Sequence, residues 1–154
     1  MSQKSEIKFL NIQIVNAALI AGVTIFLIVV YFFLKKAYFD YNDQSEFKFI
    51  APIMLIISVF GSSFLFKKQT QSITKEITLQ QKMIKYQTAT IVRSALLEFA
   101  ALIGIVATFT TSNYYFLIFT GIALVFMIFN FPTKDKFAQI LNLDFDEKAK
   151  LTNL

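Results

Sequence analysis

The chain has 154 residues, of which 56% are hydrophobic, and its formal net charge is +5. This much apolar sequence, in long runs, exceeds what one water-soluble core of this size buries, which indicates a membrane protein built as a single unit, residues 1–154. Cysteine and histidine are absent, which excludes disulfides, thiol nucleophiles, imidazole catalysis and the commonest zinc and haem ligands. We therefore expect no enzyme activity, no catalytic residue, no metal site and no cofactor.

Four apolar runs are long enough to cross a bilayer as helices, which takes roughly 20 residues. They predict spans at residues 12–34, 49–66, 90–111 and 114–131. The polar connection at 67–89 contains no glycine or proline. It is predicted to be helical, either as a projecting hairpin made by extensions of the second and third spans or as one helix on the membrane surface. The expected fold is an all-α integral membrane protein with four transmembrane helices in two antiparallel hairpins.

The tail at 132–154 begins with a proline and contains two short helical signals. Thr133 can cap a first helical turn, and Asp144 followed by Glu147 has the spacing of a capping box, with Asp in place of Ser or Thr. We expect the tail to fold back on the membrane surface or on the 67–89 hairpin. Its first turn presents three apolar side chains that we expect to dock a partner protein: Phe137, Ile140 and Leu141.

Basic residues predict the orientation of the spans. If the N-terminus is cytoplasmic, twelve of the 15 Lys and Arg residues lie on the cytoplasmic side, and the outer segments hold only Lys35, Lys36 and Lys48. This positive-inside pattern predicts an inner-membrane protein with both termini in the cytoplasm. Lys67, Lys68 and Arg93 are expected at the membrane interface, where Arg93 can reach lipid phosphates. Topology explains the positive charge, so no nucleic-acid partner is expected.

The third predicted span carries a glutamate, Glu98, about a third of the way along. A carboxylate at that depth is costly and normally faces protein or trapped water. At 100° per residue, the face of Glu98 also carries Ser94, Ala101, Leu102 and Ile105. The roughly opposite face carries a strip of small residues suited to a packed neighbour, next to an arginine: Arg93, Ala100, Gly104 and Ala107.

Three roles for Glu98 stay open. It is a proton or cation site, with Ser94 and Asn16 as accompanying polar groups; or it contacts a partner subunit; or it anchors the fold by hydrogen bonds to other helices. The side chains available for such an anchor are Asn16, Ser58, Ser62 and Asn130.

Residues 95–106, ALLEFAALIGIV, resemble the carboxylate-bearing helix of the c-subunit (proteolipid) of rotary ATP synthases. In that family an Ala-Leu-x-Glu stretch with small and aliphatic residues follows a cytoplasmic polar loop, as it does here. The resemblance covers these twelve residues of one helix. It implies that Glu98 is an ion-binding carboxylate.

The function expected from these features is that of a small non-enzymatic polytopic membrane protein, an accessory or assembly subunit of a larger inner-membrane complex. Four helices with little sequence outside the bilayer leave much lateral surface to pair. The alternative is a self-assembling conductor of protons or cations that uses Glu98. A third interpretation is a small lipid-binding or membrane-stress protein. The expected partners are the lipid bilayer and other membrane subunits or further copies of the chain.

Overall fold

The computed structural model describes residues 2–34, 36–74, 76–144 and 147–149. Extended pairing within these ranges is limited to one isolated bridge between Tyr38 and Asn113, so the prediction of an all-helical protein is confirmed. The helices are α1 Ser2–Phe33, α2 Phe47–Gln71, α3 Leu79–Thr111, the short 3-10 helix η1 Tyr114–Phe116, α4 Leu117–Phe129 and α5 Lys134–Ile140.

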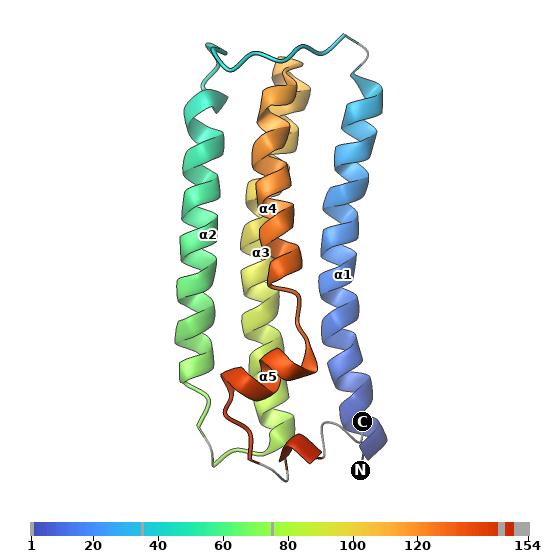
Figure 1. Ribbon diagram of the computed structural model, residues 1–154, viewed down its shortest axis with the longest axis vertical. Helices are drawn as coiled ribbons and strands as arrows, with labels where there is room; N and C mark the ends of the chain where they lie inside the picture. Colours follow the sequence, from blue (N-terminus) through green and yellow to red (C-terminus); the bar gives the residue numbers. More distant parts are fainter. Residues whose placement is uncertain (1, 35, 75, 145–146, 150–154) are drawn as a thin grey trace.

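The long helices stand side by side and alternate in direction, and α3 is the central one (Figure 1). It packs against α1, α2 and α4. Helices α1 and α2 lie on opposite sides of the α3–α4 pair instead of packing together as a hairpin, because the loop at 34–46 is long enough to bridge them. We call the end of the bundle with this loop the loop end, and the end where α2 turns into α3 the hairpin end.

Three helical segments are long and apolar enough to cross a membrane: Phe9–Phe33, Phe47–Gln71 and Leu79–Thr111. The fourth predicted span is shorter than expected. Tyr114–Phe129 meets the same criterion only together with α5, from which it is bent by 76°. Pro132 accounts for the break, because proline lacks the N–H needed to continue a helix and disfavours helical backbone at the residue before it.

The connection at 67–89 is helical at both ends, as one of the two sequence-based alternatives expected. Helix α2 continues to Gln71, and α3 begins at Leu79 after a short turn. Thr78 starts α3 with a capping box: its Oγ1 accepts the Gln81 N–H at 3.3 Å, and Gln81 Oε1 accepts the Thr78 N–H at 3.1 Å. These reciprocal bonds satisfy two donors that a helix start would otherwise leave free.

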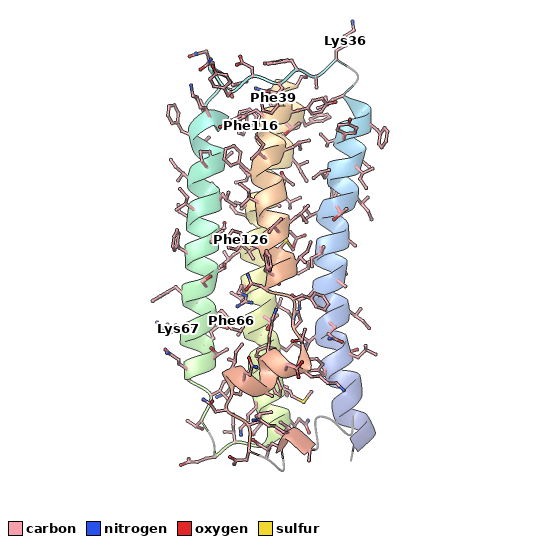
Figure 2. The ribbon with its side chains drawn as sticks, in the orientation of Figure 1. Lys36, Phe39, Phe66, Lys67, Phe116 and Phe126 are labelled. Atoms are coloured by element: carbon pink, nitrogen blue, oxygen red, sulfur yellow. The ribbon has the colours of Figure 1, made fainter. Side chains whose placement is uncertain are left out.

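Apolar side chains form both the interior and much of the outer surface. The outward faces of α1 and α2 carry large apolar side chains (Figure 2), as expected of helices that lie in a bilayer. The interior contains a cluster at the hairpin end that joins α1, α2, α3 and the tail. We call it the hairpin-end cluster, and its buried members are Phe9, Ile12, Phe66, Met83, Tyr86, Ala89, Phe137, Leu141 and Leu143.

Helices α3 and α4 come into very close contact at Gly104. A Cβ atom on Gly104 would lie 2.4 Å from Thr120 Oγ1 and 2.9 Å from the Phe116 carbonyl oxygen. The Thr120 hydroxyl donates across the interface to the Ala101 carbonyl at 2.9 Å. The small-residue strip expected to pack against a neighbour is therefore confirmed: Ala100, Gly104 and Ala107 are all buried.

Candidate functional site

Glu98 lies on α3 at the border between a packed surface and an outward-facing one, and its side chain is half-buried. On the packed side, Ser94 and Ile105 are buried. On the other side, three residues at helical spacing are exposed and form an outward-facing strip that continues from the carboxylate. We call this the α3 strip, and it consists of Ala95, Phe99 and Val106.

No other side chain pairs with the Glu98 carboxylate in the part of the chain that the structure describes. Three of the four expected anchors bond elsewhere: the Ser62 hydroxyl donates to Val59, the Asn130 amide donates to Phe126, and the Asn16 amide donates to Ile12. One hypothesis from the sequence was that Glu98 anchors the fold by hydrogen bonds to other helices. The described residues form no such bond with it. Its carboxylate stays available at the edge of the α3 strip.

Asn16 and Ser94 form the polar contact that joins α1 to α3. The Ser94 hydroxyl donates to Asn16 Oδ1, and the Asn16 amide donates to the Ile12 carbonyl at 2.8 Å. Both side chains are buried, and Ser94 is one helical turn before Glu98. The structure thus brings together Asn16 and Ser94, two of the three residues expected at the site. Glu98, the third, lies one helical turn away and makes no bond to them.

The sequence analysis expected Arg93 to reach outward to lipid phosphates. In the structure its side chain turns into the bundle instead. Its Nη2 donates to the Asn130 carbonyl at 3.2 Å, and its guanidinium carbon lies 4.0 Å from the centre of the Phe66 ring. The guanidinium is therefore held between the end of α4 and the α2 ring, where a cation and an aromatic face attract each other. The sequence pattern missed this contact because both partners are far from Arg93 along the chain.

The backbone after α4 explains why Arg93 turns inward. Four successive carbonyls, those of the last α4 residue and of the three residues after it (129–132), need donors from outside the helix. An unpaired carbonyl near a bilayer is costly. The positive charges of Arg93 and Lys136 are also stabilised at this C-terminal end of α4, because it is the negative end of the helix dipole. The donors come from three elements: Lys136 of α5 (2.7 Å to Phe129 and 3.1 Å to Phe131), Arg93 of α3, and Gln13 of α1 (3.1 Å to Pro132).

Lys67 and Lys68 are exposed in the last turns of α2, directly after the buried Phe66. Figure 2 shows Phe66 on the side of α2 that faces α3 and Lys67 on the outer side. Their position at the end of an apolar helix suits basic residues at a membrane interface. Arg93 lies at the same level as Phe66 but is used inside the bundle.

The expected docking residues are mostly internal. The side chain of Phe137 is fully buried, and its ring packs edge-on against Tyr86 at 5.0 Å and Phe9 at 5.9 Å between ring centres. Leu141 is also buried, and only Ile140 is exposed. In this structure the hairpin-end cluster of the same chain takes up Phe137 and Leu141, so these two side chains do not face a partner.

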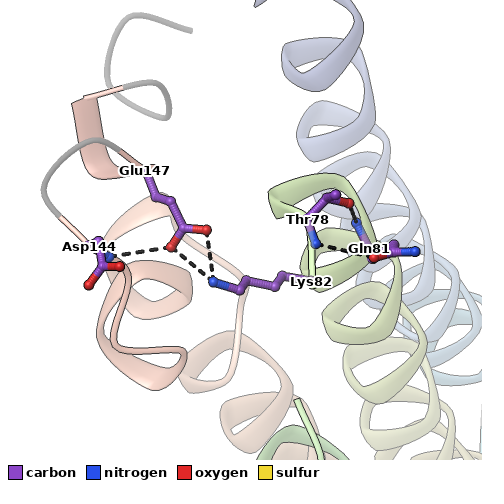
Figure 3. A network of polar contacts seen from close by, with 5 residues as sticks. All are labelled: Thr78, Gln81, Lys82, Asp144 and Glu147. Atoms are coloured by element: carbon purple, nitrogen blue, oxygen red, sulfur yellow. Dashed lines mark hydrogen bonds and ion pairs between the residues drawn. The ribbon is translucent and has the colours of Figure 1, made fainter. Parts of the chain in front are cut away.

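Lys82 and Glu147 form a contact that the sequence did not reveal. Lys82 Nζ lies 2.8 Å and 3.0 Å from the two carboxylate oxygens of Glu147 (Figure 3). The lysine side chain is only 4% exposed, against 20% for the glutamate. The same carboxylate accepts the Asp144 N–H at 3.3 Å, which is one half of the capping box expected at these positions.

Asn113, in the short turn between α3 and η1, is a second organising residue that the sequence did not reveal. It is fully buried at the loop end. Its amide donates to the Asp40 carbonyl at 2.7 Å and to the Asp43 carboxylate at 3.0 Å, and its oxygen accepts the N–H groups of Asp40 and Tyr115. Asn113 therefore ties the 34–46 loop to the turn that follows α3. The Asp43 carboxylate accepts hydrogen bonds from Ser45 and Asn113, and these bonds keep the pKa of Asp43 below its ordinary value.

Comparison with protein-family models, with curated proteins and with solved structures found no match to this chain. Across the described ranges, no three His, Cys, Asp or Glu side chains come together as ligands for a metal ion. The side chain that is available for binding is the Glu98 carboxylate. It lies at the edge of an apolar outer surface and has no partner among the described residues.

Proposed function

We propose that the chain is a small non-enzymatic polytopic protein of the inner membrane that serves as an accessory or assembly subunit. In this proposal a transmembrane helix of the larger complex packs along the α3 strip and binds Glu98. The observation that supports it is the half-buried Glu98 carboxylate, which lacks a bond to any described residue and borders exposed apolar side chains.

The physical argument concerns the cost of leaving that carboxylate unpaired. Glu98 is five residues further along α3 than Arg93, which is roughly 7.5 Å of helix at 1.5 Å per residue. At this depth an ionisable group is expensive unless a donor meets it. Among the described residues no interior donor bonds to the carboxylate: Arg93 Nη2 bonds to the Asn130 carbonyl, and Asn16 and Ser94 bond to each other. A partner helix with a basic or hydrogen-bonding side chain at the level of Glu98 supplies the missing donor.

The orientation is part of the proposal. Exposed lysines gather at the hairpin end, so we place that end, and both termini, in the cytoplasm, in keeping with the positive-inside rule. The loop end, with the acidic side chains of Asp40, Asp43 and Glu46, then faces outward. Among the residues whose side chains the structure describes, the exposed lysines at the hairpin end include Lys67, Lys68, Lys85 and Lys148.

Purification in a mild detergent from the native host, followed by native mass measurement, tests this proposal. We expect a different membrane protein in fixed ratio to the chain, and we expect Glu98→Leu to lower that ratio at least about tenfold, since loss of one partner in a buried polar contact weakens association strongly. Phe60→Leu, on the outward face of α2, is the control and should leave the ratio unchanged. A ratio that is insensitive to Glu98→Leu contradicts the proposal.

A second candidate function is favoured by the same carboxylate. Glu98 lies one helical turn from the buried Asn16–Ser94 pair, and residues 95–106 resemble the ion-binding helix of rotary proteolipids. Such a site suits a self-assembling conductor of protons or cations. In the purification, a homogeneous oligomer of the chain with no other protein would favour this conductor over the accessory subunit.

A further inference from the structure

The described part of the segment after α4 covers the hairpin end of the bundle and is tied to it near its start and again at Glu147. We call the described residues 133–144 and 147–149 the C-terminal lid. Figure 1 shows α5 below the end of α4, between α1 and α2 and in front of α3. The lid inserts three apolar side chains into the hairpin-end cluster: Phe137, Leu141 and Leu143.

The near end of the lid is anchored where it leaves α4. Gln13 of α1 donates to the Pro132 carbonyl at 3.1 Å, and Lys136 reaches back to the carbonyls of Phe129 and Phe131. The Thr133 hydroxyl accepts the Lys136 N–H and starts α5. These bonds tie the start of the lid to the end of α4 and to α1.

The Lys82–Glu147 ion pair ties the far end of the lid to α3. Glu147 is the sole ion-pair partner of Lys82 among the described residues. The Lys82 side chain is almost completely buried, and among the described residues Glu147 is the acid that compensates its charge. Removing one partner of a buried pair is costly, because the remaining charge stays in a poorly solvated position.

We propose that the C-terminal lid is a detachable cover of the hairpin end, and that the Lys82–Glu147 ion pair keeps it closed. Helix α5 has only seven residues, too few to be stable without packing. The lid therefore forms on docking and is lost on release, as a local opening that leaves the rest of the bundle folded. Release exposes Met83, Tyr86 and Phe66, an apolar surface that is otherwise hidden. The inference concerns the hairpin end and holds whether or not a partner binds the α3 strip.

Cysteine labelling tests the lid, because the chain contains no cysteine of its own. Met83→Cys places a probe under the lid, where the side chain is 1% exposed, and Val23→Cys places a second probe in the fully buried middle of the bundle. Introducing Glu147→Gln should speed maleimide labelling at position 83 at least about tenfold and leave position 23 protected. Glu76→Gln, which removes an exposed acid at the same end, should change neither rate.

The double change Lys82→Met with Glu147→Gln separates charge from packing. Because no uncompensated charge remains, labelling at position 83 should return close to its original rate. Three results would overturn the proposal: an unchanged rate at position 83 in Glu147→Gln, equal acceleration at positions 83 and 23, or no recovery in the double variant.

Discussion

Replacing Gly104 by leucine is expected to force α3 and α4 apart and to destabilise the bundle by about 3 kcal/mol or more, toward the upper range for overpacked sites. The new Cβ would already lie 2.4 Å from Thr120 Oγ1, and the Phe116 carbonyl oxygen at 2.9 Å belongs to the backbone and has little room to move. The Thr120–Ala101 hydrogen bond across the same contact would also be lost. Thermal unfolding in detergent measures the effect.

Gly121→Leu is the matched control for this change. Gly121 is on α4, next to Thr120, and a Cβ there meets no atom within 4 Å. The same increase in side-chain size should therefore cost little at this position. Equal loss of stability in the two variants would mean that close packing at Gly104 does not hold α3 against α4.

Asn113→Leu is expected to release the 34–46 loop from the α3–α4 turn and to cost about 3 kcal/mol, because several polar groups lose their partner at once and each such loss costs about 1–3 kcal/mol. Leucine is similar in size to asparagine but neither donates nor accepts. The groups left without it are the backbone of Asp40, the Asp43 carboxylate and the Tyr115 N–H. The unfolding temperature in detergent and the rate of proteolysis within the loop report the change.

Asn42→Leu provides the comparison in the same loop. Asn42 is exposed, and its backbone, not its side chain, makes the bonds to Asp40 and Gln44. Its replacement should leave both the unfolding temperature and the proteolysis rate nearly unchanged. If Asn113→Leu behaves in the same way, the loop is held by something other than the Asn113 amide.

Local patterns predicted the helices well. The apolar runs indicated α1, α2 and α3, the absence of glycine and proline in 67–89 indicated helical extensions, and Thr133 was correctly placed as the cap of α5. These features depend on residues within a few positions of one another, so that a single sequence contains the signal. The break after α4 followed from Pro132 for the same reason.

Contacts between distant residues were not predictable in this way. Lys82 and Glu147 are 65 positions apart, and Gln13 and Pro132 are 119 apart. Arg93 is an example. Its position in the sequence suggested a residue at the membrane interface, but in the structure it turns inward and donates to a carbonyl after α4. The sequence suggested that Phe137 was available to a partner, because the first turn of the tail presents it together with Ile140 and Leu141. In the structure the hairpin-end cluster buries it.

Photo-crosslinking from the α3 strip tests the central claim, that this surface binds a partner helix, most directly. A benzophenone amino acid replaces Val106 on the strip or, as control, Ile57 on the outward face of α2; the two side chains are similarly exposed, at 53% and 57%. In native membranes we predict that position 106 gives one protein adduct of defined mass, that position 57 does not, and that Glu98→Leu abolishes the adduct. The same products from both positions, or an adduct that persists without the carboxylate, would contradict the account.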